Sequence, residues 1–310
     1  MTELSPPKPM PGWFGPAMVF TGGICIGLAP IGLRLGLDDL GPQAIAFWRY
    51  AFALPLLFLL VVLVQRRLPA KPNTFVIIAG TCFALDISLW HWSLTFSTVA
   101  NATFLVNLGN ICVGITAWIF LKERPTWRWG LAVLIALIGA AALSLGGGAE
   151  GKADLRGDLL ALGAAVLVSG YMVASKVARR TLGGMETIFW LTVVELGVAG
   201  LLVLGFRESF LPADLSGFIV PLFLALTVQI AGQGLIVTGL GHTRAAIAGV
   251  LVLVQPVVAA AISWQLFDEP LAPLQAGGGF LILIGILIAQ RGREPSATPG
   301  APKPISTFVD

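Results

Sequence analysis

Charge is what this sequence has least of. Only 11% of its 310 residues are Asp, Glu, Lys or Arg, against roughly 25% in an ordinary soluble domain. Hydrophobic residues make up 56%, and the formal net charge is +3. So few charges cannot cover the surface of a soluble globule, and so small an excess of positive charge supplies no basic face for phosphates. The composition therefore argues against nucleic acid as a partner and indicates an integral protein of the lipid bilayer.

Residues for catalysis and metal binding are also scarce. The chain has three cysteines, Cys25, Cys82 and Cys112, and each lies in an apolar run, where a small core residue is expected. Two histidines without a His-Glu-x-x-His pattern, and no Gly-x-x-x-x-Gly-Lys loop, argue against zinc hydrolysis and ATP-driven pumping. Ser169-Gly170 lacks the upstream glycine of an intramembrane serine protease. The sequence thus predicts no enzyme, no cofactor and no metal site.

Long apolar runs dominate what is present. A helix crossing the hydrocarbon layer needs about 20 apolar residues, and continuous runs argue against the alternating segments of a β-barrel. The predicted fold is an all-α integral membrane protein with ten transmembrane helices. Two pairs of consecutive spans, which meet near Ser97 and near His242, are separated by so few residues that each pair could instead form a single long helix. The predicted spans are Trp13–Leu33, Gln43–Val64, Thr74–Thr95, Thr98–Leu121, Trp129–Gly146, Gly157–Ser175, Glu186–Phe206, Leu215–Leu240, Ala245–Leu266 and Leu271–Gln290.

The distribution of basic residues predicts the orientation. With the N-terminus inside, 14 of the 19 Lys and Arg fall in cytoplasmic segments and four in outer loops, which is the bias expected of short loops. Only Lys8 precedes the first span, so that span is not expected to be a cleavable signal. We expect a multi-pass protein of a bacterial inner membrane, with residues 1–12 and 291–310 as disordered cytoplasmic segments.

The chain also repeats itself. At an offset of 142 residues Trp48 meets Trp190, and at an offset of 146 Trp118 meets Trp264. This indicates a first repeat at 13–146 and a second at 157–290, joined by an outer linker at 147–156. Each repeat holds five spans, and an odd number forces the second repeat to enter from the opposite side. Inverted repeats with a substrate site between the halves are typical of secondary transporters.

Two sequence blocks carry a family resemblance. The stretch SLTFSTVANATFLVNLGNICVGITAWIFLKERPT, at 93–126, and its partner GLGHTRAAIAGVLVLVQPVVAAAISWQLFDEPL, at 239–271, resemble the signature of EamA-type members of the drug/metabolite transporter superfamily. Members usually carry proline where the second block has Pro256, whereas the first block has Asn110. The resemblance implies a ten-helix exporter of metabolites, and the general likeness is greatest to exporters of aromatic amino acids.

One polar stripe follows the third span. Asp86, Trp90 and Ser93 share a helical face, and a carboxylate beside an indole suits an ammonium group on an aromatic or apolar substrate. The alternative is a structural aspartate paired with Arg49 or with a backbone donor.

A second stripe follows the fourth span, where Asn107 and Asn110 offer amides either to a substrate carboxylate or to neighbouring helices. The remaining predicted cavity residues lie in the second repeat, where Gln229 and Gln233 share a face and Gln255-Pro256 interrupts the ninth span. They are Ser169, Tyr171, Gln229, Gln233 and Gln255.

Three further predictions concern motion and protons. Gly27 and Pro30 in the first span, and Pro256 in the ninth, are candidate hinges, with close helix packing as the alternative for the first pair. Glu195 and Asp86 are candidates for proton coupling, although a paired or protonated structural role is the alternative for Glu195.

Basic residues and histidines near span ends are expected at the surface. Arg34 and Lys176 would reach water by extending along their helices, while His91 and His242 are interpreted as surface or loop residues.

The predicted function is a secondary transporter, and so not an enzyme. It would export small amphipathic metabolites, amino acids including aromatic ones, by alternating access through a central cavity. Alternatives are another metabolite or a drug-like cation as substrate, a channel or scaffold, and an intramembrane enzyme. The predicted partners are this small-molecule substrate and the lipid bilayer, with a monomer as the expected state and a dimer as the alternative.

Overall fold

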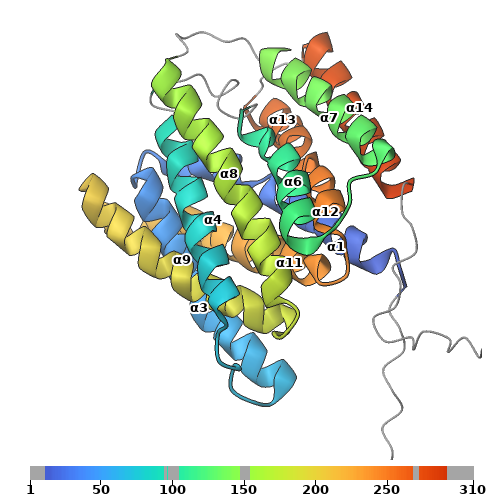
Figure 1. Ribbon diagram of the computed structural model, residues 1–310. Helices are drawn as coiled ribbons and strands as arrows, with labels where there is room; N and C mark the ends of the chain where they lie inside the picture. Colours follow the sequence, from blue (N-terminus) through green and yellow to red (C-terminus); the bar gives the residue numbers. More distant parts are fainter. Residues whose placement is uncertain (1–10, 94–95, 97–104, 147–153, 268–271, 292–310) are drawn as a thin grey trace, which may run out of the picture.

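A computed structural model describes residues 11–93, 96, 105–146, 154–267 and 272–291 (Figure 1). All regular elements in these ranges are helices, which confirms the all-α prediction. The predicted terminal segments 1–12 and 291–310 and the linker 147–156 fall largely outside the described residues. Within the described ranges, seven helical segments are long and apolar enough to cross a membrane, and three shorter apolar helices accompany them.

The helical segments correspond to the ten predicted spans, in the same order. They are α1 (Phe14–Ile26) with α2 (Ala29–Gly36), α3 (Pro42–Gln65), α4 (Thr74–Ser93), α6 (Gly109–Leu121), α7 (Trp127–Gly146), α8 (Leu155–Ala178), α9 (Gly184–Phe206), η1 (Leu215–Phe218) with α10 (Ile219–Leu224), η2 (Ala225–Gln233) and α11 (Gly234–Leu240), α12 (Ala245–Leu251) with α13 (Val254–Phe267), and α14 (Pro273–Arg291). The turn around His242 separates α11 from α12, so these two are distinct helices.

The first and ninth spans are each broken. Gly27 and Leu28 separate α1 from α2, and Pro30 is the second residue of α2. Proline is tolerated there because the first turn of a helix has no internal acceptor for its missing N–H. The ninth span is broken between α12, which ends at Leu251, and α13, which begins at Val254. This break lies just before the predicted position, Gln255-Pro256, because proline is also tolerated in the first turn of α13.

The eighth span is continuous but irregular. Its centre, η2, is a π-helix of nine residues, a wider helical turn that is rare and frequently found at functional sites. The sequence predicted a plain span here, because a π-helical stretch leaves no distinct mark on an apolar run.

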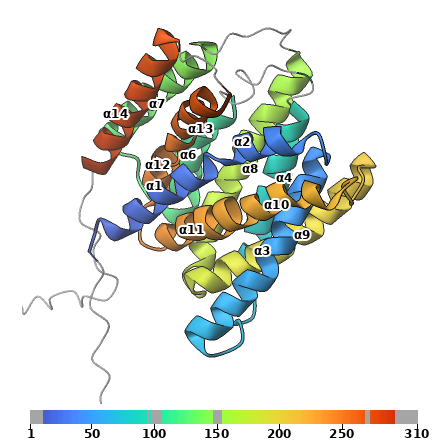
Figure 2. The same cartoon turned by 180° about the vertical axis from the view of Figure 1, so that it is seen from behind.

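The two halves interlock helix by helix. The most extensive pairings join α4 with α8, α3 with α9, and α7 with α14. Figures 1 and 2 show α7 and α14 side by side at one edge of the bundle. Small residues permit these contacts. A Cβ at Gly139 on α7 would lie 2.5 Å from the carbonyl oxygen of Gly278 on α14, and one at Gly22 on α1 would lie 2.6 Å from that of Gly232 on η2, in a further contact between the two halves. Close approach at glycine is typical of helices packed in lipid.

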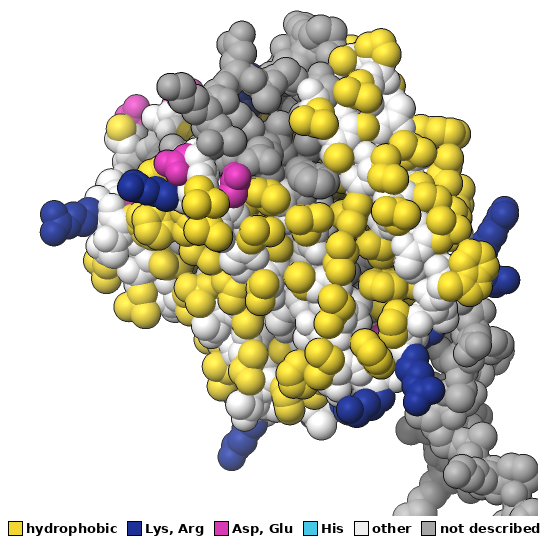
Figure 3. Space-filling model, turned by 45° about the horizontal axis from the view of Figure 1, so that its top comes forward, with side chains coloured by type: hydrophobic (Ala, Val, Ile, Leu, Met, Phe, Trp, Pro, Cys, Tyr) yellow, Lys and Arg dark blue, Asp and Glu magenta, His cyan; other side chains and the backbone are white. Residues whose placement is uncertain are grey.

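The outer surface is apolar over its middle. Figure 3 shows hydrophobic side chains over most of the visible face, with Lys and Arg side chains at its margins. Large apolar residues such as Leu63, Phe120, Leu201 and Phe280 are exposed. A soluble monomer rarely exposes such extensive apolar surface, so this surface suits contact with lipid.

Candidate functional site

The two mid-span acids lie in one polar neighbourhood. Tyr50 on α3 is within electrostatic range of Asp86 on α4 and Glu195 on α9, and so is Tyr171 on α8. All four side chains are buried. The structure therefore brings together Asp86, Glu195 and Tyr171, which the sequence placed on three separate spans.

Two amides hold the Glu195 carboxylate. Gln229 Nε2 donates to Glu195 Oε2 over 2.6 Å, and Gln233 Nε2 donates to Glu195 Oε1 over 2.7 Å. Gln229 Nε2 also donates to Thr192 Oγ1 over 2.9 Å. Both glutamines lie on the π-helix η2, which directs residues four apart towards the same part of α9. Gln229 and Gln233, predicted to line a substrate cavity, thus have their N–H groups on Glu195.

Three oxygens around this carboxylate lack partners. Gln229 Oε1, Gln233 Oε1 and Tyr171 Oη are buried without a hydrogen bond among the described residues. Tyr171 Oη lies close to the Gln233 amide, but the two do not meet with hydrogen-bonding geometry. An unsatisfied buried polar atom costs about 1–3 kcal/mol, so this arrangement is incompletely satisfied.

Asp86 is not paired with Arg49. The Arg49 guanidinium instead donates to Tyr50 Oη over 2.6 Å and lies 4.6 Å from the centroid of the Tyr50 ring. Within the described part of the chain, no ion pair or hydrogen bond to the Asp86 carboxylate is formed. Among the described residues, therefore, Asp86 has neither of its two expected structural partners, Arg49 or a backbone donor.

The rest of the α4 stripe is partly occupied. Trp90 is half-buried, and its ring lies 5.2 Å from that of His91. Ser93 Oγ donates to the carbonyl of Trp90 over 2.7 Å, a bond within its own helix that uses the hydroxyl proton. His91 is buried, so its predicted surface position was wrong. His91 lies near the end of its span, which favoured a surface position, but α4 packs against both α8 and α9.

The other predicted cavity residues are spread over neighbouring contacts. Ser169 Oγ on α8 lies 2.7 Å from Thr116 Oγ1 on α6, a hydrogen bond between two helices. Asn107 is half-buried just before α6, and the side chain of Asn110 lies outside the described residues. Gln255, half-buried on α13, faces the first span, because a Cβ at Gly27 would lie 2.9 Å from the Gln255 carbonyl oxygen. The breaks in the first and ninth spans therefore lie against each other.

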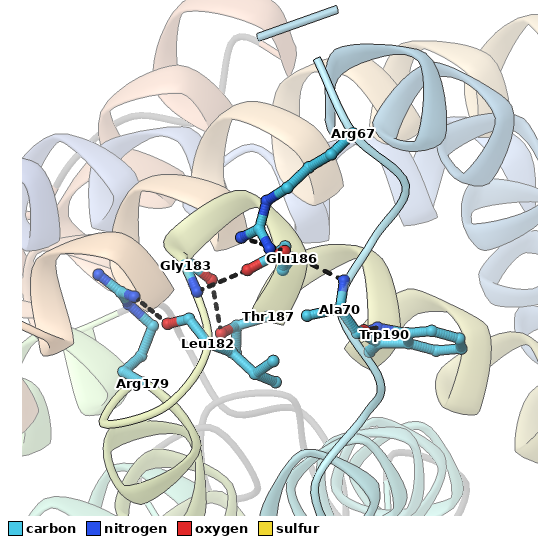
Figure 4. Close-up of polar contacts among 8 residues, drawn as sticks. All are labelled: Arg67, Ala70, Arg179, Leu182, Gly183, Glu186, Thr187 and Trp190. Carbon is cyan, nitrogen blue, oxygen red and sulfur yellow. Dashed lines mark hydrogen bonds and ion pairs between the residues drawn. The ribbon is translucent and has the colours of Figure 1, made fainter. Parts of the chain in front are cut away.

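A polar cluster closes one end of the α3–α9 pair (Figure 4). Glu186, the third residue of α9, accepts at Oε2 from the backbone N–H of Gly183 over 2.9 Å, and at Oε1 from that of Ala70 over 3.1 Å. Arg67 forms an ion pair with the same Oε1, also over 3.1 Å. Trp190 Nε1 donates to the carbonyl of Ala70 over 2.7 Å. The loop after α3 is thereby fastened to the start of α9.

The opposite end of this helix pair shows a related cluster. Trp48, the repeat partner of Trp190, donates through Nε1 to the carbonyl of Phe210 over 2.5 Å. Glu208 Oε2 accepts from the backbone N–H of Ala44 over 2.9 Å, at the start of α3. Burial raises the pKa of Glu208. The sequence singled out both tryptophans through the repeat, but it did not predict that each donates an equivalent hydrogen bond to a loop carbonyl.

Lys176 departs from its predicted surface position. It is largely buried, forms an ion pair with Glu123 over 3.0 Å and also donates to the carbonyl of Thr243. These partners belong to the segment after α6 and to the turn before α12. Nothing in the local sequence around Lys176 signals partners so distant along the chain.

Known proteins with the same two-part architecture resemble this chain. The EamA-like transporter family matches residues 13–145 and 155–290. Uncharacterized transporter YwfM of Bacillus subtilis (strain 168) is 26% identical over 78% of this chain and 82% of its own. A "Probable terminal-alkyne amino-acid exporter" of Streptantibioticus cattleyicolor is 26% identical over 86% of this chain and 92% of its own. A protein of known crystal structure superposes with a TM-score of 0.75 at 18% identity, over 89% of this chain and 98% of that one, which supports the fold alone. The chain belongs to the EamA-like transporter family and is a multi-pass membrane transporter.

Proposed function

We propose that this transporter exports small amphipathic metabolites that carry an ammonium group, foremost amino acids with aromatic or apolar side chains. Asp86 carries the proposal. Its carboxylate is buried at mid-span and has no ion pair with Arg49, the cation on the preceding helix α3. An uncompensated charge at this depth is expensive. The ammonium group of a substrate would supply the missing counter-charge.

The surroundings of Asp86 suit the rest of such a substrate. Trp90 lies one helical turn away and is only half-buried, so its ring has a face available to an apolar or cationic group. Asn107 and Asn110 come from the fourth span and supply amides for a substrate carboxylate. Support for amino acids comes from the Streptantibioticus relative, whose name describes an amino-acid exporter. The export direction rests on that relative and on the family resemblance.

Alternating access supplies the mechanism. The acids and tyrosines of the polar neighbourhood are buried, and hydrogen bonds join both ends of the α3–α9 pair to loops. In this proposal, the present conformation is the one closed around the site. The first and ninth spans, broken at Gly27 and before Pro256, would absorb the bending as one repeat rocks against the other. In this proposal the two repeats span 13–146 and 157–290, both termini are cytoplasmic, and the protein acts as a monomer in a bacterial inner membrane.

A second candidate substrate is a drug-like organic cation. One carboxylate and one indole would bind such a cation without any use for the asparagine amides. The two substrate classes differ at Asn107, because only a substrate with a carboxylate would lose binding when this amide is removed. A channel would instead show flux without exchange.

Counterflow in proteoliposomes tests the proposal. Vesicles loaded with one amino acid are diluted into a trace of labelled amino acid, and transient accumulation is recorded for a panel that includes aromatic amino acids and their decarboxylated amines. We expect accumulation of the amino acids and its loss in Asp86→Asn, with Asn107→Ala weakening amino acids more than amines. The matched control is Asp38→Asn, an exposed aspartate. Transport of another metabolite with no amino-acid exchange would overturn the substrate, and unchanged transport in both site variants would overturn the site.

A further inference from the structure

A largely buried ion pair joins the two halves of the chain where α6 and α8 end. Lys176, two residues before the end of α8, pairs with Glu123, just after α6, over 3.0 Å. Their side chains are only 19% and 12% exposed. Lys176 Nζ also donates to the backbone carbonyl of Thr243, in the turn before α12. One ammonium group therefore connects a segment of the first family-matched region, 13–145, with two segments of the second, 155–290.

Further contacts join the same segments. Arg244 Nη2, in the turn before α12, donates to the backbone carbonyl of Arg124 over 2.7 Å. The start of α1 packs on this turn, because a Cβ at Gly15 would lie 2.8 Å from the carbonyl oxygen of His242. The helices α6, α8 and α12 contact one another (Figure 1). This end of the bundle is therefore held together by contacts between the two halves.

The contact around Lys176 is incompletely satisfied. Glu123 Oε2, Thr243 Oγ1 and Ser175 Oγ are buried and have no hydrogen-bond partner within the ranges that the structure describes. A buried polar atom without a partner is unfavourable, and water would supply partners once the segments separated. Separation of these segments therefore has a favourable term that partly offsets the loss of the ion pair. Such a contact is suited to opening and closing again.

The ion pair between Arg67 and Glu186 provides a contrast. It also joins the two halves, but it belongs to the α3–α9 pair, which is fastened at one end through Trp190 and at the other through Trp48. Two helices fastened at both ends are expected to move as one unit. Lys176 instead ties three segments at a single point, so its release removes contacts to two of them at once.

We infer that Lys176 is a latch, which in this conformation keeps the predicted cytoplasmic side of the transporter closed and which opens that side when it leaves Glu123 and Thr243. The helix α8 packs along α4, the helix of Asp86, and a Cβ at Gly170 would lie 3.0 Å from Cys82 Sγ on α4. Movement of the end of α8 would therefore uncover the part of α4 that precedes Asp86. The latch rests on the alternating access of the proposed function, but it does not depend on which substrate is carried.

Cys82 provides a native probe of this opening. It is half-buried on α4, one turn before Asp86, and its neighbour Gly170 precedes Lys176 by about 9 Å of helix. The substitutions Cys25→Ala and Cys112→Ala leave Cys82 as the only cysteine. Inside-out membrane vesicles then expose the predicted cytoplasmic side to a small charged thiosulfonate that does not cross the bilayer, and spheroplasts expose the other side. The rate of Cys82 modification is measured from each side, without substrate.

The variants should rank by how much of the latch they remove. Lys176→Gln loses the charge and should raise the modification rate from the cytoplasmic side by about tenfold, the order expected when a charge-assisted contact is lost. Glu123→Gln keeps an acceptor for Lys176 Nζ and should raise the rate less, whereas Lys176→Arg keeps a cation and should stay near the native rate. The matched control is Arg67→Gln, which breaks the other ion pair at the α3–α9 pair and should leave the rate unchanged.

Three results would overturn the latch. They are native rates in both Lys176→Gln and Glu123→Gln, an equal acceleration from both sides of the membrane, and the same acceleration in Arg67→Gln. Thermal unfolding followed by tryptophan fluorescence establishes that each variant is folded, and Glu123→Gln alone decides if Lys176→Gln does not fold. Because no substrate is present, failure of the latch leaves the counterflow test of Asp86 unaffected, and failure of that test leaves the latch standing.

Discussion

The two buried acids, Asp86 and Glu195, occupy the same neighbourhood but are treated in opposite ways. Glu195 is held at both oxygens by amides on a π-helix and has Thr192 beside its partner Gln229. Asp86 has no ion pair with Arg49 and no hydrogen bond from any described residue. If both acids served only to stabilise the fold, we would expect both carboxylates to have hydrogen-bond partners, or neither.

The difference indicates a division of roles. A carboxylate with fixed neutral donors is prepared to exchange a proton, because its partners can reverse their amides without moving the backbone. A carboxylate without a fixed partner is available to an external cation. We therefore expect variants of Asp86 to affect every mode of transport, and variants of Glu195 to affect only the mode that uses protons.

The largest effect is expected for Asp86→Asn. Removing the charge should cost the substrate ammonium a charge-assisted contact of about 2–3 kcal/mol, which corresponds to on the order of 100-fold weaker binding. Substrate-dependent thermal stabilisation of purified protein and counterflow should both be lost. If Asp86→Asn keeps counterflow while Glu195→Gln loses it, the two roles are reversed.

Glu195→Gln should produce a narrower loss. A glutamine of nearly equal shape can still accept a hydrogen bond but cannot bind the proton, so accumulation driven by an imposed pH gradient should disappear. Counterflow, which needs no net driving force, should stay within about twofold of the native rate, because the substrate site is intact. Both assays use the same vesicles, so their ratio is independent of protein yield. Equal loss in the two assays would contradict the division between the acids.

The sequence predicted the helical spans and the two buried acids, but not the side chains that contact those acids. The apolar spans and the places of Pro30 and Pro256 near helix starts depend on residues close together in the sequence, and the described helices follow them in the same order. The two repeats are visible because the sequence resembles itself at a fixed offset. Asp86 and Glu195 were also identifiable, because an acid inside an apolar run is rare on composition alone.

The partners depend on contacts between distant segments. Gln229 and Gln233 share a face in any helix, but their convergence on Glu195 also requires that η2 lie within hydrogen-bonding reach of α9. Likewise, Lys176 was expected to reach solvent, whereas the turn before α12 and Glu123 enclose it. Helical periodicity places residues on a face, and it contains no information on which helix that face will meet.

The stability of the Gln229→Leu variant tests how far the fold depends on the amide that binds Glu195. It leaves Glu195 Oε2 and Thr192 Oγ1 without their shared donor, so the folded state should lose about 1–3 kcal/mol, read as a lower midpoint in thermal unfolding followed by tryptophan fluorescence. The control on the same π-helix is Thr227→Val, where an exposed hydroxyl bonds only within its own helix. Adding Glu195→Gln to Gln229→Leu should recover part of the loss. No recovery would mean that the loss reflects the packing of the substituted side chain rather than the buried carboxylate.

The smallest effect is expected at Glu208, an acid at the end of the helix pair that is neither fully buried nor exposed to the substrate. Because burial raises the pKa of Glu208 above its ordinary value of 4.5, the folded chain binds this proton more tightly than the unfolded chain. Its contribution to stability is therefore largest below the ordinary value and declines as the pH rises through the raised pKa.

Glu208→Gln keeps an acceptor for the Ala44 N–H and should flatten the dependence of the unfolding midpoint on pH across this range. Trp48→Phe, which removes the neighbouring bond to Phe210 without removing a titrating group, should lower the midpoint equally at every pH. An unchanged slope in Glu208→Gln would show that the pH response of the fold arises elsewhere.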